Sequence, residues 1–158
     1  MDFDIEEIED LSGRKAHIYS IRPRGSETTL LEDFFSENES EYETELDEIW
    51  NILYLSGHEL GCRPNVFKPN EGNPGDGVCA LRLDCMRLYC LVIGSITVIL
   101  GSGGYKDPAI SAYQEDETLN AKAEQMKHYA KEINKRIKDR DITIDPCNGK
   151  LTINNWED

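Results

Sequence analysis

Hydrophobic positions recur at helical spacing in three stretches of the chain. The first two predict helices over about 26–38 and 42–56, joined by a short acidic link at 39–41. The third predicts a long helix over 118–138 with one buried face and a lysine-rich outer face. The apolar stripes consist of Leu30, Leu31, Phe34 and Phe35, then Leu46, Ile49, Trp50 and Leu53, and finally Leu119, Ala123, Met126, Ala130, Ile133 and Ile137.

Shorter apolar runs between these helices predict β-strands. Asp84-Cys85 and Gly94-Ser95 occupy positions where hairpin turns belong, since glycine readily supplies the positive φ that such turns require. The run 86–93 is apolar on both faces, which predicts a central strand covered by the long helix. Extended segments are predicted over 15–21, 66–68, 78–83, 86–93, 96–100, 142–145 and 151–154.

Taken together, these elements predict an α+β fold. We expect an N-terminal helical pair, a twisted antiparallel sheet of about 3–5 strands, a long C-terminal helix packed on that sheet, and a terminal β-hairpin. Residues 1–14 have no usable period and are expected to be disordered. Residues 15–158 are expected to form a single domain, because 158 residues are too few for two ordinary ones.

Charge is distributed unevenly along the chain. The formal net charge is −14, and residues 1–50 hold 16 Asp/Glu against 4 Lys/Arg. Residues 58–108 are balanced, with five acids and five bases. Such acidity argues against general nucleic-acid binding, because a polyanion is repelled. No run approaches a membrane span and the acidic N-terminus lacks the pattern of a signal peptide, so we expect a cytoplasmic protein without membrane contact.

Cysteine and histidine patterns indicate no cofactor and no metal. Five cysteines are an odd number and no pair is spaced CxxC, so we expect buried, reduced thiols. The three histidines lie in separate predicted elements and form no triad or metal pattern. His58, beside Gly57 and a loop, is the one histidine that we consider as a proton-transfer candidate.

Arg82 and Arg87 flank the first hairpin turn, which makes them cross-strand neighbours on one face. Such a pair suits a phosphate, because guanidinium groups bind phosphate through two parallel hydrogen bonds. The alternative is that each arginine pairs with a carboxylate of Asp84, Glu71 or Asp76. The glycines at 101–104, followed by Lys106, can form a nest of backbone N–H groups for an anion, or simply a flexible exit from the strand.

The runs LRL, MRLYCLVIG and ITVILGSGGYK, followed by AYQEDETL and a long helix, carry a resemblance to a known family. Over about residues 42–138 the chain resembles the RelE/HigB-like toxins of bacterial toxin–antitoxin pairs. Leu81-Arg82 and Arg87-Leu88-Tyr89 match the two arginine strands, and Lys106 follows the third strand as the family's basic residue does. The pI of 4.6 and the reduction of a double-basic motif to Lys106-Asp107 indicate an acidic branch of this group.

The resemblance implies endoribonuclease activity on messenger RNA within the ribosome, under the control of an antitoxin of the helix-turn-helix type. By the same resemblance, Arg82 and Arg87 would hold phosphate and Lys106 would stabilise developing charge. Tyr113 or His58 would move protons. The alternative function is a non-catalytic module that uses the same scaffold to bind a protein partner. Neither reading predicts an oligomeric state.

Overall fold

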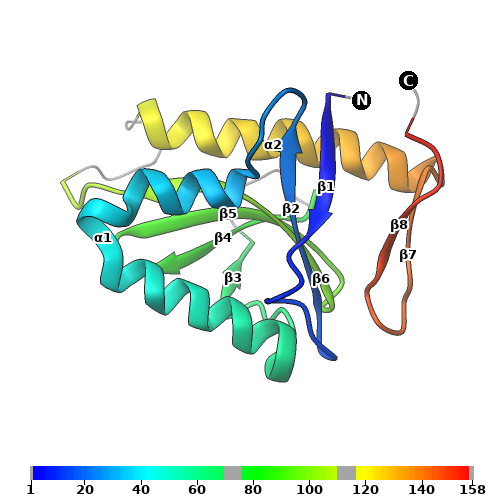
Figure 1. Cartoon of the computed structure of the whole chain (residues 1–158), viewed down its shortest axis with the longest axis horizontal. Coiled ribbons are helices and arrows are strands. Elements are labelled where there is room, and N and C mark those ends of the chain that lie inside the picture. Colours follow the sequence, from blue (N-terminus) through cyan, green and yellow to red (C-terminus); the bar gives the residue numbers. More distant parts are fainter. Residues whose placement is uncertain (1, 70–75, 110–116, 157–158) are drawn as a thin grey trace.

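Strands from both halves of the chain form one six-stranded sheet with the order β1-β2-β6-β5-β4-β3 (Figure 1). The computed structural model describes residues 2–69, 76–109 and 117–156. β2 and β6 run parallel, whereas the other neighbouring strands run antiparallel. The strands are β1 (Phe3–Glu7), β2 (His17–Pro23), β3 (Phe67–Lys68), β4 (Val78–Leu83), β5 (Met86–Ile93) and β6 (Thr97–Tyr105).

The expected antiparallel sheet of about 3–5 strands is therefore wrong in both size and topology. Its error lies at β2, which pairs with residues 97–100 of β6 in a parallel register. The first helix and the strands β3, β4 and β5 lie between these two strands in the chain, so no local turn indicates the pairing. The N-terminus also differs from expectation, because residues 3–7 form β1 and Leu11 is fully buried.

The expected helical pair is likewise wrong, since residues 30–55 form one helix, α1 (Leu30–Leu55). Its backbone departs from helical dihedral angles at Tyr42, with φ −128° and ψ 35°, and the helix kinks there into two arms (Figure 1). The acidic stretch before the kink stays helical because glutamate is a good helix former. Thr29 and Glu32 form a capping box at the start of α1, and a π-helical turn, η1 (Ser56–Leu60), extends its end.

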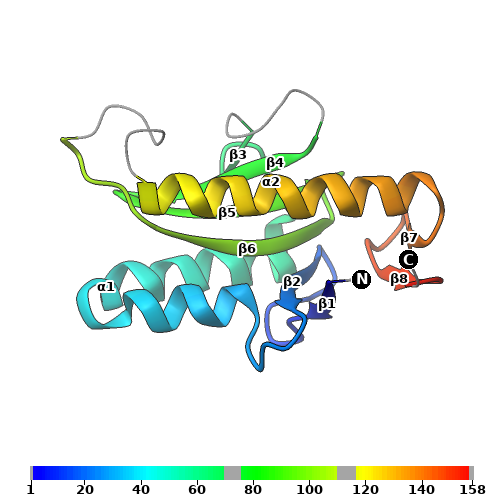
Figure 2. The ribbon, with the colours of Figure 1, turned by 90° about the horizontal axis from the view of Figure 1, so that it is seen from above.

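Two helices cover opposite faces of the sheet (Figure 2). α1 packs on the face that carries Leu81, Leu88 and Leu100. α2 (Glu117–Lys138) packs on the other face, where Ala80 and Tyr89 are buried beneath it. Each strand of the sheet centre thus sends alternate side chains to α1 and to α2, which explains why β5 is apolar on both sides.

A separate two-stranded hairpin, β7 (Ile142–Ile144) and β8 (Leu151–Ile153), follows α2. It attaches to the sheet through Tyr19 of β2, whose hydroxyl accepts a hydrogen bond from the Leu151 backbone N–H at 2.8 Å. Near the C-terminal end, the indole N–H of Trp156 donates to the carbonyl of Phe3 at 2.8 Å, so this end of the chain is tied to β1.

Candidate anion-binding site

The register of the β4–β5 hairpin makes Arg82 and Arg87 direct cross-strand partners. Ala80 and Tyr89, the pair two steps further along the ladder, are buried against α2. Because side chains alternate across a strand, both arginines project from the α2 face of the sheet. Two guanidinium groups that share a face at this spacing repel each other unless negative charge lies near them.

The turn between the two strands holds one of these arginines in place. A terminal nitrogen of the Arg87 guanidinium donates to the carbonyl oxygens of Asp84 at 2.8 Å and Met86 at 2.9 Å. Asp84 adopts a left-handed conformation with φ 51°, which closes the two-residue turn and aims its carbonyl at Arg87. These two backbone carbonyls thus help to orient the guanidinium group of Arg87.

Lys106 lies at the same end of the sheet, immediately beyond β6. Its backbone N–H donates to the carbonyl of Cys85 at 2.6 Å, which places Lys106 beside the β4–β5 turn. Tyr105, the last residue of β6, faces α1, and Lys106 follows it directly. The fold therefore gathers three of the predicted site residues, Arg82, Arg87 and Lys106, at one edge.

The structure does not bring His58 to this edge. His58 lies in η1, where its ring stacks on Tyr54 with centroids 4.0 Å apart and its Nε2 is 3.2 Å from the Asp10 carbonyl oxygen. The residue of α1 that contacts the end of β6 is Tyr42, at the kink, which stacks on Tyr105. His58 lies sixteen residues after Tyr42, which corresponds to a distance of roughly 24 Å along a helix. Tyr113 falls outside the described residues.

A polar cavity of about 450 Å³ adjoins the arginine row, because one of its walls is Gly104, the cross-strand partner of Arg87. Leu100 is the last residue of β6 that pairs with β2. The cavity lies beside the part of β6 that follows Leu100. Lys122 of α2 and Glu37 of α1 close it from two sides with an ion pair of 3.3 Å. The segment predicted as a nest or a flexible exit is therefore a strand that floors a cavity.

Tyr105 is a residue of this site that the sequence did not single out. Its ring stacks on Tyr42 with centroids 4.7 Å apart and planes 6° from parallel. A hydrogen bond with the Cys85 side chain raises the pKa of Tyr105, and desolvation and neighbouring negative charge raise it further. Alternation along β6 could have revealed its place, but the strand was expected to end at residue 100.

The three cysteines that the core buries are not assembled for metal binding. Burial raises the pKa of Cys62 to about 12 and that of Cys90 well above its ordinary value. Across the described ranges, no group of three or more His, Cys, Asp or Glu side chains could hold a metal ion. The expected burial of thiols fails at Cys147, which is exposed, and Cys85 is half-buried.

Comparison with protein-family models, with curated proteins and with solved structures finds no match for this chain. In the part of the chain that the structure describes, neither helix has the length and apolar character that crossing a membrane requires.

Proposed function

We propose that this protein is a RelE/HigB-like endoribonuclease that acts on messenger RNA in the cytoplasm and is held in check by a helix-turn-helix antitoxin. The observation that carries the proposal is the cross-strand pair Arg82 and Arg87 on one face, with Lys106 beside their turn. Two arginines that share a face, with Lys106 beside their turn, suit a phosphodiester, because guanidinium groups bind phosphate oxygens through paired hydrogen bonds.

In the proposed reaction, a ribose 2′-hydroxyl gives up its proton to water and its oxygen forms a bond to the adjacent phosphorus. The bond from phosphorus to the next nucleotide's 5′-oxygen breaks, and that oxygen takes up a proton. The products are a 2′,3′-cyclic phosphate and a 5′-hydroxyl. Arg82 and Arg87 would bind the phosphate oxygens, and Lys106 would stabilise the negative charge that develops on them. Tyr113, the residue to which the resemblance assigns proton transfer, would supply the proton that the leaving 5′-oxygen needs.

The distribution of charge supports this location on an otherwise acidic chain. The excess acid lies in residues 1–50, which form β1, β2, the first arm of α1 and the start of its second arm. The strands that carry the arginines belong to the balanced segment 58–108 and present them on the face opposite to α1. An RNA that approaches from the α2 side meets the cations before the acidic arm.

The test is induced expression in bacteria, followed by measurement of growth and of messenger cleavage. We expect growth arrest with the wild type, and a loss of RNA cleavage on the order of 100-fold for Arg87→Ala. Arg24→Ala is the matched control, because Arg24 is an exposed arginine on the first half of the chain. Mass spectrometry of the cleaved RNA should show cyclic phosphate ends.

Two outcomes would contradict the proposal. If Arg87→Ala and Arg24→Ala both cleave RNA like the wild type, the arginine pair is not the site. If the wild type neither arrests growth nor cleaves RNA, the alternative of a non-catalytic protein-binding module replaces the nuclease.

A further inference from the structure

A second cavity lies away from the arginines, between the β1 end of the sheet and α1. It encloses about 700 Å³, a volume typical of ligand sites. Its apolar lining comes from Ile8, Leu31, Phe35 and Trp50, and we call it the Trp50 groove. Leu31 is buried at its base, whereas Trp50 is 38% exposed, which is unusual for so large an apolar side chain.

The kink of α1 creates this groove. In a straight helix, Phe35 and Trp50 would be separated by fifteen residues, or roughly 22 Å. The reversal at Tyr42 instead brings their rings edge to face, with centroids 5.9 Å apart. The two arms of α1 thereby place an aromatic corner, formed by half-buried Phe35 and exposed Trp50, beside the groove.

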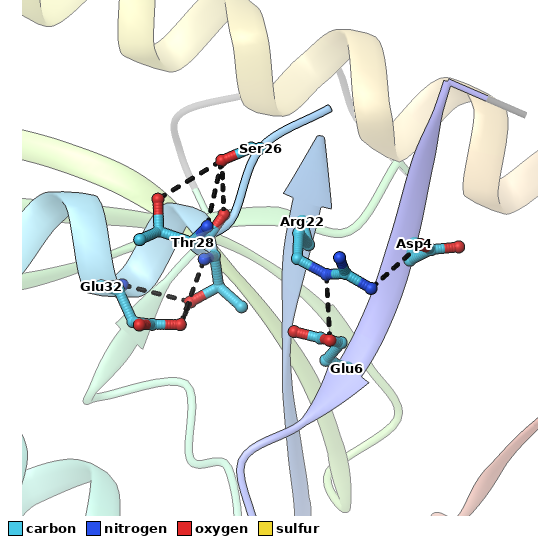
Figure 3. A network of polar contacts seen from close by, with 7 residues as sticks. Asp4, Glu6, Arg22, Ser26, Thr28 and Glu32 are labelled. Carbon is cyan, nitrogen blue, oxygen red and sulfur yellow. Dashed lines mark hydrogen bonds and ion pairs between the residues drawn. The ribbon is translucent and has the colours of Figure 1, made fainter. Parts of the chain in front are cut away.

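Carboxylates surround the aromatic corner, namely Glu6, Glu7, Glu9 and Glu32. The lining residues include no lysine, arginine or histidine. Glu32 is oriented by the capping box, because it accepts a hydrogen bond from the Thr29 backbone N–H at 3.2 Å (Figure 3). Its charge is not neutralised by that contact and remains directed at the groove.

Nearby cations offset only part of this charge. Arg22 bridges Asp4 at 3.3 Å and Glu6 at 3.0 Å, so one positive charge is shared between two carboxylates (Figure 3). Glu7 is engaged by His17 and, at 3.8 Å, by Lys150. Glu9 is exposed at the rim. The net charge of −12 over residues 1–50 strengthens the field that a cation would meet on approach.

We propose that the Trp50 groove is the docking site for an arginine-rich segment of a partner protein. One guanidinium group would stack on the Trp50 indole, as arginine does on aromatic faces, while others pair with Glu9 and Glu32. An aliphatic side chain of the same segment would cover Leu31 and Phe35. This inference concerns the α1 face and is independent of the ribonuclease proposal, which concerns the α2 face.

The test is calorimetric titration of the full chain with a twelve-residue peptide of alternating arginine and leucine, followed also by tryptophan fluorescence. We expect saturable binding that weakens with salt, and no binding of a peptide in which glutamate replaces every arginine. Glu9→Lys should weaken binding at least about tenfold, which corresponds to the loss of one strong charge contact. Glu59→Lys, which adds the same charge on exposed η1 outside the groove, should bind within about twofold of the wild type.

The role of the indole is tested by Trp50→Ala, with Trp50→Phe as a second variant that retains a ring if the alanine variant does not fold. Binding should fall in the first and be partly restored in the second. The proposal is overturned if the wild type does not bind, if Glu9→Lys and Glu59→Lys weaken binding equally, or if arginine amide alone binds as tightly as the peptide. Arg87→Ala should bind the peptide like the wild type. The two proposals are therefore tested separately, and the failure of one does not affect the test of the other.

Discussion

The hydroxyl of Tyr19 and the backbone N–H of Leu151 lie 2.8 Å apart in a buried hydrogen bond that joins the sheet to the terminal hairpin. Tyr19→Phe would leave that N–H without a partner while preserving the ring. We expect a loss of about 1–3 kcal/mol in the free energy of unfolding, measured by urea denaturation. Tyr54→Phe, at a ring that is 44% exposed, should change it by less than about 0.5 kcal/mol. Equal effects of the two changes would show that the Tyr19 bond is not a structural anchor.

Gly103 and Gly104 are neighbours in β6 with opposite tolerance for a side chain. A Cβ at Gly103 would lie 1.8 Å from the Arg87 carbonyl oxygen, which is backbone and cannot move aside. A Cβ at Gly104 would meet nothing closer than Leu119 at 4.0 Å. Gly103→Ala should therefore destabilise the protein by more than about 3 kcal/mol, and Gly104→Ala by less than about 1 kcal/mol. Thermal unfolding followed by circular dichroism measures both, and similar melting temperatures would contradict the described β5–β6 pairing.

Glu7 makes the stability of the protein depend on acid pH. Partial burial raises the pKa of its carboxyl, but hydrogen bonds with His17 and Ser12 and the charges of His17 and Lys150 outweigh burial and bring the pKa below its ordinary 4.5. A depressed pKa contributes stability that is complete above 4.5 and is lost as the pH falls through the folded-state value. Glu7→Gln should thus flatten the decline in unfolding free energy at acid pH, whereas Glu59→Gln should not. A decline of unchanged slope in Glu7→Gln would assign the acid sensitivity to other carboxyls.

Thiol reactivity should separate the five cysteines into classes. Burial raises the pKa of Cys62 to about 12, and Cys90 is fully buried, so neither forms the reactive thiolate in the native state. Cys147 is exposed and should react first with a chromogenic disulfide reagent. Cys147→Ser should remove the fast phase, and all remaining thiols should react after denaturation. A fast phase that survives this substitution would place a second reactive thiol at the surface, with half-buried Cys85 the first to examine.

Local signals explain which parts of the fold could be predicted. The bounds of β4 and β5 agree with the sequence pattern, because Asp84-Cys85 and Gly94 are turn residues placed between apolar runs. The same two-residue turn sets the register that pairs Arg82 with Arg87, so this half of the site could be derived from sequence alone.

Long-range relations explain what could not be predicted. Nothing near His17 signals that β2 lies parallel to β6, since that pairing depends on how α1 crosses the sheet. Trp50 fits the apolar stripe of its arm but is 38% exposed, because the kink at Tyr42 turns it towards the first arm. Tyr105 was missed for a related reason, since its stacking on Tyr42 exists only when both the kink and the end of β6 are in place.

The parallel contact between residues 17–20 and 97–100 has a consequence for biosynthesis. While the chain is being made, β1, β2 and α1 emerge first, and the strand that completes their layer follows about 80 residues later. At the usual pace of translation, this interval lasts roughly 4 to 16 seconds. During this interval, the edge of β2 that later pairs with β6 exposes unpaired backbone N–H and C=O groups. We therefore expect a chaperone to bind the nascent segment.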